Sequence, residues 1–155
     1  MQIVKITPFK VIGIAVRTTN DNGQSAKDIG VLWQRFMSEG IAEKIPNKMD
    51  NEVLSIYTNY QGDHTQPYDT ILGCRVNTLE GIPAGMVGQA FDGGTYAKYI
   101  SKGDLTQGAV YETWVEIWSK NLKRVFTADF EVYGEKALNP TDVEVEILVA
   151  IKNKK

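Results

Sequence analysis

The chain has 155 residues, of which 43% are hydrophobic and 23% are charged, as is usual for one globular domain. Seventeen basic and nineteen acidic residues are interspersed and give a net charge of −2. Direct nucleic-acid binding is therefore not expected, because domains with that function usually carry a basic face. No apolar run approaches the roughly 18 residues of a membrane span, and the N-terminus lacks the apolar core of a signal peptide. We expect a cytoplasmic protein without a membrane contact.

Metal and disulfide chemistry are also disfavoured by the composition. Cys74 is the only cysteine, so no internal disulfide can form, which fits a reducing compartment. It lies in an apolar run and is expected to be a small buried side chain rather than a nucleophile. His64 is the only histidine and lies in a polar segment, where a solvated loop side chain is expected. We expect no metal site and no cofactor.

The first half of the chain predicts strand, helix, strand, strand. Residues 3–16 are rich in β-branched side chains and predict one strand or two short ones. A helix is expected within residues 25–45, with Ser25 as its N-cap. Strands are predicted at residues 52–60 and 68–77. The apolar face of the helix is predicted from helical spacing: Ile29, Leu32, Trp33, Phe36, Met37 and Ile41.

The second half repeats this order. One or two strands are predicted over residues 85–100, with a bulge or bend at a pair of glycines. A helix is expected at residues 106–122, followed by strands at 126–133 and 143–151. The apolar face of this second helix is predicted to carry five residues: Tyr111, Trp114, Val115, Trp118 and Leu122.

The repeated order predicts an internal duplication. We expect a single α+β domain over residues 1–155, made of two βαββ halves at about 1–80 and 81–155. A pseudo-twofold axis would relate the halves, the sheet would be mostly antiparallel, and a ligand groove would lie at its centre. An offset of 76 residues supports the duplication because it aligns apolar pairs: Ile56-Tyr57 with Val132-Tyr133, and Ile71-Leu72 with Ile147-Leu148.

Several short motifs, taken in order, resemble the GyrI-like superfamily, which is also called the AraC-type effector-binding superfamily. The resemblance covers nearly the whole chain. The family includes the drug-sensing halves of multidrug transcription activators and a stand-alone inhibitor of DNA gyrase. The motifs are Gly94-Thr95-Tyr96-Ala97, the Trp-bearing helix from Tyr111 to Trp118, the strand Asp129-Phe130-Glu131-Val132-Tyr133, and the closing strand Val143-Glu144-Val145-Glu146-Ile147; Val53 to Tyr57 and Ile71-Leu72-Gly73 match in the first half.

The resemblance implies a central pocket in which Glu131 meets small, lipophilic cationic ligands. The physics agrees, because a carboxylate among aromatic rings is poorly hydrated and a cation supplies both its counter-charge and cation–π contacts. The alternative is a solvated Glu131 on an edge strand, with the aromatic side chains serving only as core. The candidate pocket aromatics are Tyr133, Trp114 and Tyr96, then Trp33 and Tyr57 from the first half, and Phe36 and Trp118 on the two helices.

Three functions remain open at this point. The first is a stand-alone sensor or sequestering domain, since this sequence has no room for the helix-turn-helix of the family's regulators. Such a domain allows a homodimer and a separate DNA-binding or protein partner. The second is a hydrolase of strained electrophiles, with Glu131 and either Tyr96 or Tyr133 as base and acid. The third is an inhibitor that acts by protein interaction, as the gyrase inhibitor does.

Overall fold

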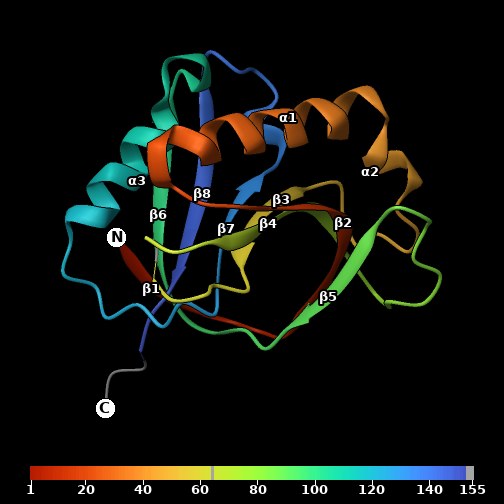
Figure 1. Cartoon of the computed structure of the whole chain (residues 1–155), viewed down its shortest axis with the longest axis horizontal. Helices are drawn as coiled ribbons and strands as arrows, with labels where there is room; N and C mark the ends of the chain where they lie inside the picture. The colour runs from red at the N-terminus through yellow and green to blue at the C-terminus, as the bar shows by residue number, and fades with distance from the viewer. Residues whose placement is uncertain (64, 153–155) are drawn as a thin grey trace.

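The computed structural model describes residues 1–63 and 65–152, so the prediction for His64 lies outside the described residues. Two helices lie on the same side of a sheet (Figure 1). They are α1 (Gln24–Ser38) and α3 (Ala109–Ser119), and a short α2 (Ile41–Lys44) follows α1. The strands in the described part of the chain are β1 (Gln2–Ile6), β2 (Phe9–Thr18), β3 (Val53–Thr58), β4 (Tyr68–Val76), β5 (Val87–Phe91), β6 (Gly94–Gly103), β7 (Ala128–Tyr133) and β8 (Val143–Ala150).

The strands form one sheet in the order β1-β6-β8-β7-β3-β4-β2-β5, and every pairing is antiparallel. This order reads the same from either edge once each strand is replaced by its counterpart in the other half. The halves meet at β3 and β7, and each gives its first strand to the other: β1 pairs with β6, and β5 pairs with β2. The predicted α+β fold, with two related halves and an antiparallel sheet, is confirmed.

The offset of 76 residues holds at the centre of the sheet and fails one strand further out. Ser55 pairs with Glu131 across β3 and β7, so the pseudo-twofold axis passes between these two residues. In β4, however, Leu72 packs in the cluster beneath α1, whereas Leu148 of β8 packs with the opposite face. Because a one-residue slip moves a side chain to the other face, the counterpart of Leu72 is Ile147, which packs beneath α3.

The core consists of three clusters divided by the sheet. One lies between α1 and the sheet and includes Ile12, Leu72 and buried Cys74. A second lies beneath α3 and contains the alternating side chains of β8. The third lies on the opposite face and includes Tyr96 and Phe130. No helix in residues 1–63 or 65–152 is both long and apolar enough to cross a membrane.

The predicted first helix is two helices. The N-cap of α1 is Gly23, at φ 69°, and the predicted N-cap, Ser25, lies inside the first turn of α1. The chain breaks at Gly40, whose φ of 60° ends the helical path. Met37, in the last turn of α1, is 71% exposed and does not belong to the buried face predicted for it, while Ile41 is buried from α2.

The predicted apolar face of the second helix is wrong in part. Trp114 is buried, but Tyr111 and Val115 are 64% and 45% exposed. The buried positions in α3 are Val110, Trp114 and Ile117, at i, i+4 and i+7. Two smaller side chains, one turn on either side of Trp114, therefore set the face that contacts β8.

Candidate functional site

A cavity of about 350 Å³ lies between the two long helices and the centre of the sheet. Both α1 and α3 contribute to its walls, and β3 and β7 contribute to its floor. Its lining is rich in aromatic side chains: Trp33, Tyr57, Tyr60, Tyr68, Tyr111, Trp114, Trp118 and Tyr133. The position next to the pseudo-twofold axis matches the predicted central groove.

Glu131 lies at the floor of this cavity and is only 2% exposed. Its Oε1 accepts a hydrogen bond from the Tyr133 hydroxyl at 2.5 Å. Its Oε2 accepts two more, from the Tyr57 hydroxyl at 2.7 Å and from the Trp114 indole Nε1 at 2.6 Å. Three neutral donors, from both halves of the molecule, therefore converge on one buried carboxylate.

Burial raises the pKa of Glu131, while the hydrogen bonds from Tyr133, Tyr57 and Trp114 lower it and so offset part of that rise. The same burial, together with the nearby carboxylate, raises the pKa of Tyr57 and Tyr133 well above the ordinary tyrosine value. Both phenols consequently remain protonated and act as donors near neutral pH.

The rings around Glu131 hold one another by edge contacts. Trp33 of α1 meets Tyr133 with ring centroids 4.9 Å apart and planes 76° apart. Tyr57 meets Trp114 at 5.7 Å and 85°. Edge-to-face packing of this kind stabilises each pair by about 0.5–1.5 kcal/mol beyond area burial. The side chains of the floor are thus fixed in place by the helices above them.

Arg124 also lines the cavity, but its charge is paired elsewhere. Its Nη2 lies 2.7 Å from Oδ2 of Asp129, which is completely buried. Asp129 also accepts hydrogen bonds from the Tyr60 hydroxyl at 2.5 Å and from the backbone N–H of Ala150 at 2.7 Å. This second carboxylate is neutralised by an arginine, whereas Glu131 is not.

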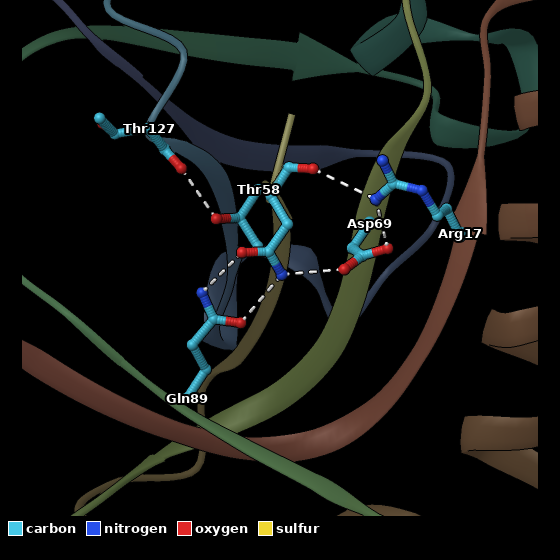
Figure 2. Close-up of polar contacts among 6 residues, drawn as sticks. Arg17, Thr58, Asp69, Gln89 and Thr127 are labelled. Carbon is cyan, nitrogen blue, oxygen red and sulfur yellow. Dashed lines mark hydrogen bonds and ion pairs between the residues drawn. The ribbon is translucent and has the colours of Figure 1, made fainter. Parts of the chain in front are cut away.

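The wall residue Tyr60 lies two residues after the end of β3, and polar contacts of Thr58 and Asn59 fix the chain before it. Figure 2 shows Thr58 directed toward Thr127, whose backbone oxygen accepts its hydroxyl proton at 2.8 Å. Asn59, at φ 51°, donates from its amide to Asp69 at 2.8 Å and to Gln89 at 3.2 Å. These contacts tie the end of β3 to β4, to β5 and to the segment before β7, so that Tyr60 reaches Asp129.

Six of the eight predicted site residues line the cavity together: Glu131, Tyr133, Trp114, Trp33, Tyr57 and Trp118. Tyr96 does not, which corrects the prediction. It lies in the core of the opposite face, where its hydroxyl donates to the Ala128 carbonyl at 2.9 Å. The proposed pairing of Tyr96 with Glu131 in a hydrolase is thereby excluded. Phe36 does not line the cavity either. It lies one turn beyond Trp33, is buried in the cluster beneath α1, and has its ring centroid 6.1 Å from that of Trp33.

Sequence reasoning missed Tyr60, Tyr68 and Arg124. Tyr68 could have been found, because it alternates with Thr70 and Leu72 on the helix-facing side of β4. Tyr60 depends on the left-handed Asn59, which interrupts the alternation of β3 and leaves no readable pattern. Arg124 lies in the irregular segment between α3 and β7, where periodicity carries no signal.

A family model described as Cass2, integron-associated effector binding protein, matches residues 2–151. The chain belongs to this family. The Cass2 integron cassette protein from the mobile metagenome of Vibrio cholerae has a similar crystal structure, with 30% identity, a TM-score of 0.75, and coverage of 97% of this chain and 95% of that one. The resemblance to GyrI-like effector-binding domains is confirmed, and binding of a small-molecule effector follows for this Cass2-family chain.

One further relative of this Cass2-family chain and one protein of similar fold are informative. YobU of Bacillus subtilis (strain 168), described as a candidate transcriptional regulator, is 28% identical over 144 residues and 90% of each chain. SAV2435, solved with bound tetraphenylphosphonium, has a TM-score of 0.79 at 16% identity, with coverage of 97% of this chain and 93% of that one. At that identity the likeness to SAV2435 shows the fold alone.

Proposed function

We propose that the cavity binds a lipophilic organic cation and that Glu131 is its counter-charge. The observation that carries this proposal is that Glu131 is buried with neutral hydrogen-bond partners and without a counter-charge among the described residues. The carboxylate is almost fully buried, and its three hydrogen-bond partners are neutral. Within residues 1–63 and 65–152, no lysine or arginine forms an ion pair with it. A buried charge without a counter-charge is costly, and a bound cation supplies the missing charge.

The rings of the cavity add the second part of the affinity. A cation over an aromatic face gains roughly 0.5–2 kcal/mol at each ring, and the flat walls also bury apolar ligand surface. A ligand of about 25 heavy atoms, at roughly 0.3 kcal/mol per atom, reaches about −7.5 kcal/mol, which is near micromolar affinity. That affinity suits a receptor that senses or sequesters varied compounds.

Chemical support comes from SAV2435, which shares the fold and was solved with tetraphenylphosphonium. That ligand is a lipophilic monovalent cation with about 25 heavy atoms, the size used in the estimate above. The aromatic lining and the buried carboxylate of the present cavity are the features that such an ion requires.

The test compares tetraphenylphosphonium with neutral triphenylphosphine oxide, each titrated by tryptophan fluorescence and by calorimetry. Glu131→Gln keeps the shape of the side chain and removes its charge. We expect it to weaken cation binding by about 1–3 kcal/mol, the range for an interaction with a charged group, with little effect on the neutral compound. Glu116→Gln, on the exposed side of α3, is the matched control. Equal cation affinity in the native and Glu131→Gln proteins would show that Glu131 is not the counter-charge.

A further inference from the structure

A second cavity, of about 440 Å³, lies beyond the end of α3, and its charge is opposite to that of the chain as a whole. We call it the basic cleft. Four cationic side chains line it: Lys120, Lys123, Arg124 and Lys152. None of its lining residues in the described part of the chain is acidic, although acidic residues outnumber basic ones in the whole sequence.

The cations of the basic cleft differ in how far the described residues neutralise their charge. Lys123 and Lys152 form no ion pair with any residue in the described part of the chain. Lys120 lies 3.9 Å from Glu116, and both side chains are at least half exposed, so this pair screens the lysine weakly. Arg124 is neutralised by Asp129, yet its Nε is buried without a hydrogen-bond partner among the described residues.

The floor of the basic cleft is apolar and partly aromatic. It is formed by Ile117, Trp118, Leu122 and Phe126. The guanidinium carbon of Arg124 lies 4.3 Å from the centre of the Phe126 ring, a cation–π contact that joins this cation to the floor. An apolar floor with a cationic rim is complementary to a small molecule that has an aromatic body and an acidic group.

The backbone keeps the rim together. The N–H of Lys152 donates to the Lys123 carbonyl at 2.8 Å, and the N–H of Val125 donates to the Ala150 carbonyl at 3.1 Å. These bonds join the segment after α3 to the end of β8, so two lysines distant in sequence are held at one opening. The fold therefore fixes the backbone positions from which the two lysine side chains extend.

We infer that the basic cleft is a second binding site, for small aromatic or amphipathic organic anions such as carboxylates, sulfonates or phosphate esters. Its volume fits a small molecule. Trp118 and Arg124 line both the basic cleft and the first cavity, so the two sites share a wall. The inference does not depend on the first cavity binding cations, because its evidence lies in the lysines and in three floor residues that do not line the first cavity, Ile117, Leu122 and Phe126.

The test uses anilinonaphthalenesulfonate, an aromatic monoanion whose fluorescence rises in apolar sites. We compare the native protein with Lys123→Gln/Lys152→Gln and with a control of equal charge change, Lys44→Gln/Lys102→Gln, on exposed positions outside the basic cleft. The cleft variant should bind the dye about 3- to 10-fold more weakly, as removal of two exposed charge interactions implies. The control variant should bind as the native protein does.

Two further measurements identify the site. Raising ionic strength from about 0.01 M to about 1 M shortens the screening length from about 30 Å to about 3 Å, so dye binding to the native protein should weaken. Trp33→Ala alters the wall of the first cavity only and should leave dye binding unchanged. Thermal unfolding of each variant verifies that it is folded.

Three results would overturn the inference. The first is equal dye affinity in the cleft variant and its control. The second is dye binding that Trp33→Ala abolishes, which would place the anion in the first cavity. The third is duplex DNA that binds tightly, displaces the dye and depends on the same two lysines, since the cleft would then be part of a nucleic-acid surface. The first and third outcomes do not bear on cation binding at Glu131, whereas the second would also count against a cation-selective first cavity. The titrations of Glu131→Gln with tetraphenylphosphonium therefore distinguish a failure of one proposal from a failure of the other.

Discussion

Replacing Tyr133 by phenylalanine should move the pH range over which the cavity binds cations. The substitution removes the hydroxyl that donates to Oε1 of Glu131 at 2.5 Å and leaves the ring that packs on Trp33. Burial raises the pKa of Glu131, and the hydrogen bond from Tyr133 lowers it. Without that bond, the charged form loses one of its three donors, so the carboxyl should hold its proton to a higher pH.

The size of this change follows from the strength of one hydrogen bond to a charged group, about 1.5–3 kcal/mol. At 1.36 kcal/mol per pH unit, the midpoint should rise by about 1–2 pH units. The sign for binding is fixed by the charge. A cation needs the ionised carboxylate, so affinity is high above the pKa of Glu131 and is lost as pH falls through it. The native protein should therefore bind at lower pH than Tyr133→Phe.

The assay is titration with tetraphenylphosphonium at several values between about pH 4 and pH 8, with the dissociation constant plotted against pH. Tyr111→Phe is the matched control, because Tyr111 lines the same cavity but its hydroxyl forms no hydrogen bond with the described residues. Its midpoint should equal that of the native protein. A flat native profile would refute Glu131 as the counter-charge, and equal midpoints in native and Tyr133→Phe proteins would refute the effect of the hydroxyl.

Two further predictions concern stability. The pKa of Glu131 is raised in the folded state, so the stability that this carboxyl contributes is present below its unfolded-state pKa and is lost as pH rises through its folded-state pKa. Near neutral pH, Glu131→Gln should therefore unfold at a higher temperature than the native protein. A lower unfolding temperature for the variant at that pH would contradict the prediction. Arg124→Met should lower the free energy of unfolding by about 3–5 kcal/mol, because it leaves Asp129 buried without its ion-pair partner. Urea denaturation measures this loss. A loss below about 1 kcal/mol, the range of exposed ion pairs, would show that the pair is effectively solvated.

Much of the fold can be predicted from the sequence, because the local pattern of apolar side chains agrees with the tertiary structure over most of the strands. The alternating side chains of β8 face α3 as the pattern predicts, and the order of elements predicts the pairing of the two halves. The boundaries that failed are those set by single backbone conformations. Gly40 at φ 60° ends the first helix early, and no apolar periodicity marks that break.

For the site, the successes and the errors have different physical origins. Glu131 and Tyr133 lie two residues apart on one strand, so alternation places both on the same face. Tyr96 was assigned by its place in a short motif, although β6 directs it to the opposite face beside Ala150. Motif position identifies a strand, whereas only the register identifies which face a side chain occupies.

The pseudo-twofold frame also explains why the floor of the cavity holds one carboxylate rather than two. Glu131 pairs across the axis with Ser55, and directly opposed side chains in antiparallel strands lie about 4.5–5.5 Å apart. A second carboxylate at that position would repel the first and force one of the two to take a proton. Ser55 instead donates from its hydroxyl to the Tyr57 hydroxyl at 3.3 Å, and that phenol in turn donates to Glu131.

Ser55, which occupies the position equivalent to Glu131, therefore supports the Glu131 carboxylate through the hydroxyl of Tyr57. The counterpart of Tyr57 in the second half is Tyr133. The symmetry of the backbone provides two matched phenols, and the asymmetry of one position leaves a single negative charge between them. Under the proposed function, this floor neutralises one positive charge. A divalent ligand would carry its second charge into a ring-lined space with no free anion among the described lining residues, at a desolvation cost that the rings offset only in part. Monovalent cations are accordingly the ligands that the cavity should prefer.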